Sequence, residues 1–405
     1  MHYSAYESVR TLTRPLSFVL GQWSEALHHD LNPWRGTKIN SAVASLVELP
    51  HRILKDYPRQ AFGVTAEIDG ETVVLPEVVV DTLPFCDLVG FPMEGAEEKP
   101  KVLIAAALSG HYATLLRDTV RGFARDFDPY ITDWKNARDV PLEEGDFGIE
   151  CYVTYLMNFM ETLGPGTHLV ATCQAAPAAL MAAALLAERH PELVPASVTL
   201  MAGPIDTQIN RNTINKVTDI IPLDRMRKHN IKTVPSRYAG AGRRVYPGFF
   251  QLTGFVTLSL VPHIKRHASH VKNIAKGEDD AAEIFRDFYD EYFAVLDMTE
   301  NFYIESLERV FFDHHLPRGV VTYEGDRIDF GAIENIPLLT IEGANDNMCS
   351  IGQTEAAHGL CPNIPDELRG HHVQDGVGHY GVFSGSKFQN HIYPVARDFI
   401  HDHHA

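Results

Sequence analysis

A cysteine with small neighbours stands where a nucleophile could act. The segment Ala171-Thr172-Cys173-Gln174-Ala175 is a variant of the G-x-S-x-G motif, with alanine in place of both glycines and cysteine in place of serine. Small residues are needed two positions before and after the nucleophile, because it sits on a sharp turn between a strand and a helix. The motif indicates a nucleophile elbow, and on its own it fits a buried structural cysteine equally well.

An acid and a histidine follow Cys173 in the chain. Asp346 lies in EGANDNMCS, directly after the apolar run PLLTI, and His379 lies in GVGHYGVFSG, after the last predicted strand. Nucleophile, acid and histidine follow one another in this order in α/β-hydrolases. Asp206, in GPIDT after the strand that follows the nucleophile helix, is the alternative acid. The order therefore predicts a catalytic triad of Cys173, Asp346 and His379.

The chemistry of such a triad is acyl transfer. His379 takes the thiol proton of Cys173, while Asp346 holds the imidazole in the right tautomer and stabilises its cation. The oxyanion that forms on the substrate needs hydrogen-bond donors from the backbone N–H after the nucleophile and from the loop after an earlier strand. We therefore expect Gln174 and Ser109 to form the oxyanion hole, Ser109 lying in ALSGHYATLL.

The elements around these residues follow the pattern of βαβ units. From Lys101 onward, short apolar runs alternate with longer amphipathic ones, which predicts a mostly parallel sheet flanked by helices. Strands are predicted over 101–108, 129–134, 167–172, 196–203, 336–343 and 367–375. Helices are predicted over 111–126, 147–164, 174–192, near 352–360 and after Ser386. Each residue of the triad then follows a strand, at the carboxyl edge of the sheet.

The βαβ pattern stops between about Ile205 and about Pro317. Within this stretch, residues 279–315 carry apolar side chains at helical spacing. The sequence therefore predicts an α/β-hydrolase fold with a helical cap inserted after the strand that follows the nucleophile helix. The predicted parts are a helical extension over 1–70, a first core part over 71–205, the cap over 206–317 and a second core part over 318–405.

One apolar segment of the cap, Tyr246–Val261, could contact an apolar substrate. It is shorter than the roughly 20 apolar residues that a membrane-spanning helix needs. A buried wall of the cap is the alternative interpretation. We predict that Phe249, Phe250 and Phe255 of this segment bind substrate. Trp134 is predicted to line the acyl pocket, with ordinary core packing as its alternative.

The composition argues against several classes of function. A count of 35 Lys and Arg against 53 Asp and Glu gives a formal charge of -18, which repels nucleic acid and anionic lipid. The amino terminus lacks a basic region leading into an apolar run, so no export signal is predicted. Five cysteines without short paired spacing indicate neither a disulfide framework nor a zinc site. We expect a cytoplasmic protein without metal or cofactor, and the sequence leaves a homo-oligomer open.

Six further segments carry a family resemblance that runs over nearly the whole chain. They are SGHYATLLRDT, ITDWKNARDVP, ATCQAAP, MAGPIDT, FYDEYFAVLDMTENFYIESLERVF and GHYGVFSG. Together they resemble intracellular polyhydroxybutyrate depolymerases, which are related to polyhydroxyalkanoate synthases. The resemblance implies an α/β-hydrolase fold and attack on intracellular polyester granules by a cysteine, without a metal. It also implies that Cys173, Asp346 and His379 occupy the family's triad positions.

Two other functions remain open at this point. A synthase-like acyltransferase would use the same cysteine elbow, although synthases usually keep glycines where Ala171 and Ala175 stand. A non-catalytic protein that coats granules through its apolar cap segment is the second. The acceptor of the acyl group, water or a thiol, is not settled by the resemblance.

Overall fold

The computed structural model describes most of the chain. The described residues are 3–29, 31–34, 37, 40, 43–44, 47–48, 51, 55, 57–68, 71–93, 95, 98–258, 269–270, 273 and 279–404.

An eight-stranded sheet forms the centre of the molecule, in the strand order β15-β14-β8-β7-β5-β6-β4-β3. The strands from β15 to β6 run parallel, and β4 pairs antiparallel with both β6 and β3. Their bounds are β3 Val78–Leu83, β4 Cys86–Gly90, β5 Lys101–Ala105, β6 Asp128–Trp134, β7 His168–Thr172, β8 Val198–Met201, β14 Leu338–Gly343 and β15 Arg369–Gln374. All six predicted strands are present. The hairpin of β3 and β4 lies before the βαβ units and was not predicted.

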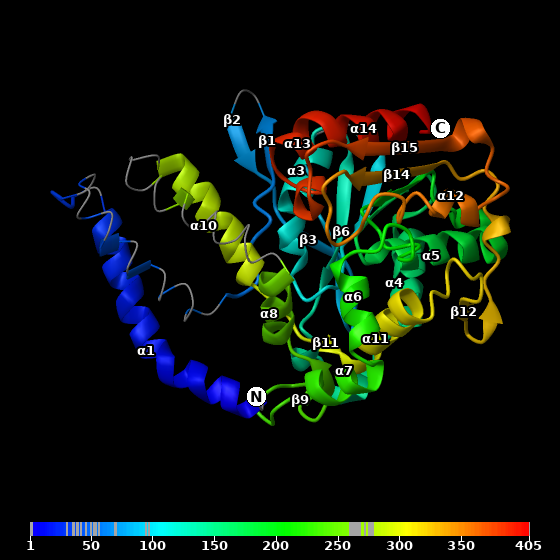
Figure 1. Ribbon diagram of the computed structural model, residues 1–405. Helices are drawn as coiled ribbons and strands as arrows, with labels where there is room; N and C mark the ends of the chain where they lie inside the picture. The colour runs from blue at the N-terminus through cyan, green and yellow to red at the C-terminus, as the bar shows by residue number, and fades with distance from the viewer. Residues whose placement is uncertain are drawn as a thin grey trace.

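Helices cover the sheet, as Figure 1 shows. The helix α3 (Arg117–Phe123) packs with α14 (Tyr393–Asp402), and α4 (Ile149–Leu163) packs with α5 (Ala175–Arg189). The mostly parallel sheet, the flanking helices and an insertion after β8 confirm the predicted α/β-hydrolase fold class. Among the described residues, no helix combines the length and the apolar character that crossing a bilayer demands.

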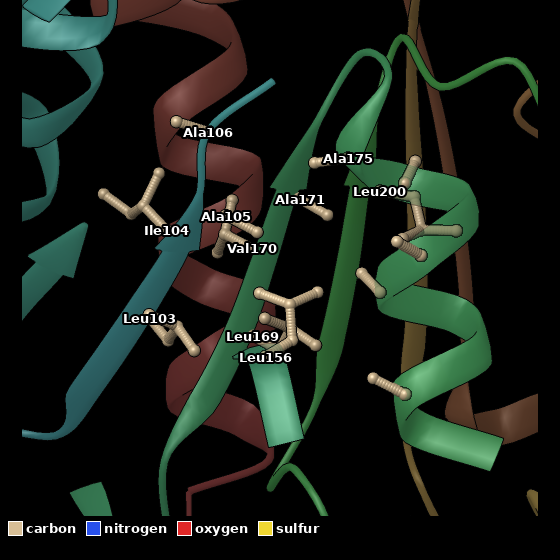
Figure 2. Packing of buried hydrophobic residues seen from close by; sticks show 14 of the residues in the cluster. Leu103, Ile104, Ala105, Ala106, Leu156, Leu169, Val170, Ala171, Ala175 and Leu200 are labelled. Carbon is tan, nitrogen blue, oxygen red and sulfur yellow. The ribbon is translucent and has the colours of Figure 1, made fainter. Parts of the chain in front are cut away.

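The core lies where α5 meets the middle of the sheet. Every residue of α5 from Ala175 to Leu186 is buried, and seven of these twelve are alanine. Figure 2 shows Ala175 near Ala171 of β7 and the side chains of β5 beside those of β7. Alanine side chains let the helix backbone approach the strands closely, so the start of α5 is held firmly against the sheet.

A long insertion lies between β8 and β14 and contains the stretch that is predicted to be the cap. Its elements are α6 Thr213–Ile220, α7 Leu223–Asn230, β9 Lys232–Thr233, β10 Arg244–Tyr246, α8 Gly248–Leu258, α10 Asp279–Phe293, β11 Met298–Thr299, α11 Glu300–Ser306, a π-helical turn Leu307–Phe312, and the hairpin of β12 Thr322–Tyr323 and β13 Asp326–Arg327. The three strands β9, β10 and β11 make a small antiparallel sheet. They were not predicted, because strands of two or three residues leave no periodic pattern.

The helical spacing over 279–315 is interrupted by β11. Between α10 and α11 the chain leaves the helix, and Val295 forms a β-bridge with His111. The carboxylate of Asp297 is buried there and accepts hydrogen bonds from the hydroxyl of Tyr3 and from the backbone N–H of Gly248 at 2.9 Å. These tertiary contacts outweigh local helix propensity.

The N-terminal helix α1 (Tyr3–His28) stands out from the sheet body on the side where α10 lies (Figure 1). Its first residue, Tyr3, packs edge-on against Phe249 of α8, with ring centroids 5.9 Å apart. A short hairpin of β1 (Thr65–Ile68) and β2 (Glu71–Val74) precedes the central sheet. The predicted boundaries at 70, 205 and 317 stay a prediction.

Candidate active site

Cys173 occupies the turn between β7 and α5. Its φ of 49° lies in the left-handed region, which costs free energy for any residue with a Cβ and is typical of functional turns. The turn is held by two backbone hydrogen bonds, from the N–H of Cys173 to Met201 O at 2.8 Å and from the N–H of Ala176 to Cys173 O at 3.1 Å. The strand, turn and helix expected around Cys173 are all present.

The turn leaves almost no room on its inner side. A Cβ built on Gly203 would lie 2.2 Å from the Cβ of Ala176 and 3.4 Å from Cys173 O. Ala171 and Ala175 are fully buried on the two sides of the cysteine. Small residues are therefore required in the elbow itself and also at Gly203, after β8.

Hydrogen bonds join Asp346, His379 and Cys173. His379 Nδ1 lies 2.7 Å from Asp346 Oδ2, and His379 Nε2 lies 3.1 Å from Cys173 Sγ. Asp346 follows β14, and His379 follows β15. Because all three residues come directly after parallel strands, they meet at the carboxyl edge of the sheet. The structure brings the three predicted residues together, and their catalytic role stays a prediction.

Hydrogen bonds from the protein fix the carboxylate of Asp346. Its Oδ1 accepts the backbone N–H groups of Met348 at 2.7 Å and of Cys349 at 2.9 Å. The other oxygen, Oδ2, is thereby directed at His379. The predicted alternative acid behaves differently, because Asp206 Oδ1 accepts the N–H of Gln208 in its own turn at 2.9 Å.

A buried carboxylate that sequence reasoning missed organises the loop beyond Asp346. Glu342, with no exposed surface, accepts hydrogen bonds from the backbone N–H groups of Gly352, Thr354 and Glu355. The hydroxyl of Thr354 in turn accepts the N–H of Gly203 at 2.9 Å. This network links the loop of the acid to the residue that packs under the elbow.

The environment of His379 favours its cationic form. Burial alone would lower the pKa of His379, but the negative charges of Asp346 and Cys173 outweigh it, and the pKa is raised well above its usual value. The ring is also enclosed by Phe383, whose centroid lies 5.3 Å away. A proton taken from the thiol is therefore held stably on the imidazole.

A large cavity opens above the cysteine. Its volume is about 1110 Å³, and Cys173, His379, Gln174 and Ser109 all line it. Much of the wall is apolar, contributed by the cap and by the loop after β5. The apolar lining residues include Leu115, Leu116, Ile214, Phe285, Phe288, Leu307 and Phe311. Gln174 directly follows the cysteine and Ser109 lines the same cavity, and their role as an oxyanion hole stays a prediction.

The residues predicted to bind substrate are placed elsewhere. Trp134 is 1% exposed, and its Nε1 donates to Ala106 O at 2.7 Å in the core, behind the cavity wall. Phe249 and Phe250 pack on each other, with centroids 4.6 Å apart, and neither lines the cavity. Their helix contributes Gln251 to the lining instead. The side chain of Phe255 lies outside the described part of the chain.

One group of side chains has the composition of a cation site. Oxygens of Glu342 and Glu355 and a nitrogen of His371 lie within 4.8 Å of one another. The carboxylate of Glu342, however, already accepts three backbone N–H groups of the neighbouring loop. We interpret this group as an anchor for that loop.

Comparison with known proteins gives a family match, and it also finds solved structures that are similar to the chain at low sequence identity. The chain is similar to the alpha/beta hydrolase GrgF from Penicillium sp. sh18, with 14% identity, coverage of 82% of this chain and 99% of that one, and a TM-score of 0.48. It is also similar to the enol-lactonase from Burkholderia xenovorans LB400, with 12% identity, coverage of 78% and 97%, and a TM-score of 0.43. A third similar structure is a thermophilic esterase from Thermogutta terrifontis, with 12% identity, coverage of 82% of this chain and 100% of that one, and a TM-score of 0.43. No curated protein matches the chain.

The family match covers the cap and the second part of the core. Residues 202–404, half of the chain, match the model described as the C-terminus of PHB de-polymerase. This stretch contains Asp346 and His379 and begins after β8, so Cys173 lies before it. Together with the fold, the match supports ester hydrolysis. The chain belongs to the PHB depolymerase family.

Proposed function

We propose that the chain hydrolyses the ester bonds of poly(3-hydroxybutyrate) through an acyl-enzyme on Cys173. The observation that carries this proposal is the pair of hydrogen bonds that join His379 to Asp346 and to Cys173, at 2.7 and 3.1 Å. Cys173 and His379 line a cavity of about 1110 Å³. A nucleophile, a base and an orienting acid are thus aligned where an apolar polyester chain could enter.

Acylation begins with transfer of the thiol proton to His379 Nε2. The thiolate of Cys173 attacks the ester carbonyl, and the carbonyl electron pair moves onto oxygen. When the tetrahedral intermediate collapses, the C–O bond breaks and the alkoxide takes the proton from His379. The products of this half-reaction are a thioester on Cys173 and a polymer end with a free hydroxyl.

Deacylation runs the same proton path with water. His379 Nε2 takes a proton from water, the hydroxide attacks the thioester, and Cys173 leaves as the thiolate and regains the proton. Asp346 remains ionised throughout and keeps the Nδ1 proton in place. In both half-reactions the oxyanion is held by the backbone N–H groups of Gln174 and Ser109, which line the cavity beside the cysteine.

We further propose cytoplasmic polyester granules as the place of action. All five cysteines are free thiols, which suits a reducing compartment. The formal charge of -18 disfavours nucleic acid and anionic membranes as partners. Hydrolysis of the polymer needs no metal or cofactor in this mechanism. We also propose that the chain is divided into the four parts that the sequence indicates. In this division the cap over 206–317 contributes much of the cavity wall.

Variants at Cys173 test the proposal. Cys173→Ala should lower kcat/KM on p-nitrophenyl butyrate and on amorphous polymer by at least about 10⁴-fold, because no other group can form the acyl-enzyme. Cys173→Ser should keep only a small residue of activity, since a hydroxyl is far harder to deprotonate than a thiol. Cys151→Ala, half-buried on α4 and outside the cavity lining, is the control and should match the wild type. Full activity in Cys173→Ala would remove this residue from the mechanism.

A further inference from the structure

An apolar stripe runs along the outer side of α1. Its residues Leu12, Leu16, Val19 and Trp23 are 79%, 53%, 48% and 62% exposed. Their spacing of four, three and four residues places them within about 60° of one another around the helix. This stripe is narrower than the apolar face by which a helix packs on its own core, and it is typical of the seam between two paired helices. In Figure 1 the helix projects from the body that contains the central sheet.

The opposite side of α1 carries polar residues that hold the helix to the rest of the chain. The carboxylate of Glu7, 7% exposed, accepts a hydrogen bond from the hydroxyl of Tyr238 at 3.1 Å. Ser17 is 5% exposed, and its hydroxyl lies 3.4 Å from the Nδ1 atom of His51. Glu7 and Ser17 lie about 140° around the helix from Leu12, at the start of the stripe. The usual arrangement of a surface helix is therefore reversed in α1, because polar groups are buried and apolar groups are exposed.

The area of the stripe suits one half of a protein–protein interface. With the exposed fractions above and side-chain areas of about 150–250 Å², the stripe exposes on the order of 450 Å² of apolar surface. An interface that is about 60% apolar would then bury about 750 Å² on each partner, close to the roughly 800 Å² of a standard stable interface. Exposed apolar patches of this size mark interaction sites.

A second copy of the stripe is a suitable partner for it. All four residues of the stripe are apolar and uncharged, so facing side chains of two copies do not repel each other, although each chain has a formal charge of -18. Each layer of the seam then joins two apolar side chains, whichever way the two helices run. Burial of these side chains on both copies stabilises the pair.

We propose that the stripe of α1 packs against the same stripe of a second copy, so that the protein is a homodimer joined through this helix. A two-fold axis between the copies uses the same surface on both, as in other isologous interfaces. Cys173, Asp346 and His379 lie together within one chain and outside α1. The inference therefore does not depend on the proposed function.

Variants of opposite charge test the pairing. In sedimentation velocity over a wide range of protein concentration, the wild type should have twice the mass of one chain. Leu16→Glu/Val19→Glu places unpaired carboxylates in the seam, and its dissociation constant should rise by at least about 100-fold. Leu16→Lys/Val19→Lys should dissociate to a similar extent. A mixture of these two variants should form mixed dimers, because each glutamate then faces a lysine whichever way the helices run.

Phe18→Glu is the matched control on the same helix. Phe18 is 68% exposed and lies about 130° from the centre of the stripe, so this substitution should leave the dissociation constant unchanged. Far-UV circular dichroism checks that every variant is folded. A monomeric wild type, a dimeric Leu16→Glu/Val19→Glu, or a mixture without mixed dimers would overturn the inference. A monomeric wild type whose adsorption to amorphous polymer is lost in Leu16→Glu/Val19→Glu would assign the stripe to polymer instead.

Discussion

Cys173 differs from the buried cysteines of the chain in its surroundings. Burial raises the pKa of the Cys86 and Cys349 thiols well above the usual value and that of Cys361 to about 12. Those three thiols therefore stay protonated and unreactive near neutral pH. Cys173 is half-buried at the cavity floor and has an imidazole nitrogen 3.1 Å from its sulfur, so it is the cysteine equipped to act as a nucleophile.

The role of Asp346 can be tested by a substitution to asparagine, which keeps the shape of the side chain. In Asp346→Asn the amide can donate to His379 Nδ1, which favours the wrong tautomer of the imidazole. We expect kcat to fall by about 10⁴-fold with a normal melting temperature. Asp206→Asn is the matched control and should change the rate only mildly. The reverse ranking of these two variants would place the acid after β8.

The candidate catalytic residues could be predicted from the sequence because their neighbours are of an unusual type. A cysteine between alanines and a histidine between glycines stand out in a sequence, and so does an acid directly after an apolar run. Glu342, Thr354 and Gly203 could not be predicted, because their contribution comes from contacts that only the folded chain creates. The sequence left two alternatives for Trp134, because a large aromatic residue at a strand end fits a core and a pocket equally well, and the structure places it in the core.

At the scale of elements, the elbow depends on close packing between α5 and the loop after β8. Gly203→Ala would bring its Cβ within 2.2 Å of the Cβ of Ala176, so the start of α5 must shift. We expect a loss of about 1–3 kcal/mol in the free energy of unfolding and a lower kcat. Adding Ala176→Gly removes the clash and should restore most of kcat, at a helix cost of about 1 kcal/mol. Thermal unfolding and kcat should be measured for Gly203→Ala and for the double variant. Wild-type values in Gly203→Ala alone would contradict the packing argument.

The helix α10 contributes aromatic residues to the cavity wall, in place of the phenylalanines at the start of α8. Phe288 lines the cavity, whereas Phe250 lies against Phe249. Phe288→Ser should therefore lower the rate on amorphous polymer by about 10-fold or more, given the value of burying one phenylalanine. The smaller p-nitrophenyl butyrate needs less apolar contact and should lose less. Phe250→Ser is the control, and an equal effect of both variants on polymer would show that α8 also grips it.

The alternation of elements could be predicted where strand and helix repeat. The strands that became β5, β7 and β14 have buried apolar runs between turn residues, and α4 and α5 have clear helical composition. The hairpin of β3 and β4 escaped because it precedes the repeating units and β3 is largely exposed. The predicted helix near 352–360 is helical only over Ala357–Leu360, and the turns before it are held by hydrogen bonds from the N–H groups of Gly352 and Thr354 to Glu342.

At the scale of the whole molecule, buried histidines couple folding to pH. Burial lowers the pKa of His111 from 6.5 to about 4, and burial with nearby histidines lowers that of His168 to about 4. Between about pH 6.5 and 4 the unfolded chain binds these protons and the folded chain does not, so stability falls as the pH falls. His111 alone should remove about 2 kcal/mol between pH 7 and 5. Urea unfolding at pH 7 and pH 5 measures this loss, and His111→Phe should lose about 2 kcal/mol less between the two values. The same pH dependence in His111→Phe and in the wild type would show that His111 does not cause it.

In the proposed mechanism the acyl group passes through Cys173. The most direct measurement is rapid mixing of the protein with the p-nitrophenyl ester of 3-hydroxybutyrate, an acid quench within the first turnover, and peptide mass analysis. We predict one added 3-hydroxybutyryl group on the peptide that contains Cys173, released by hydroxylamine as a thioester is. A 3-hydroxybutyryl group on any other residue, or full turnover by Cys173→Ala, would contradict it.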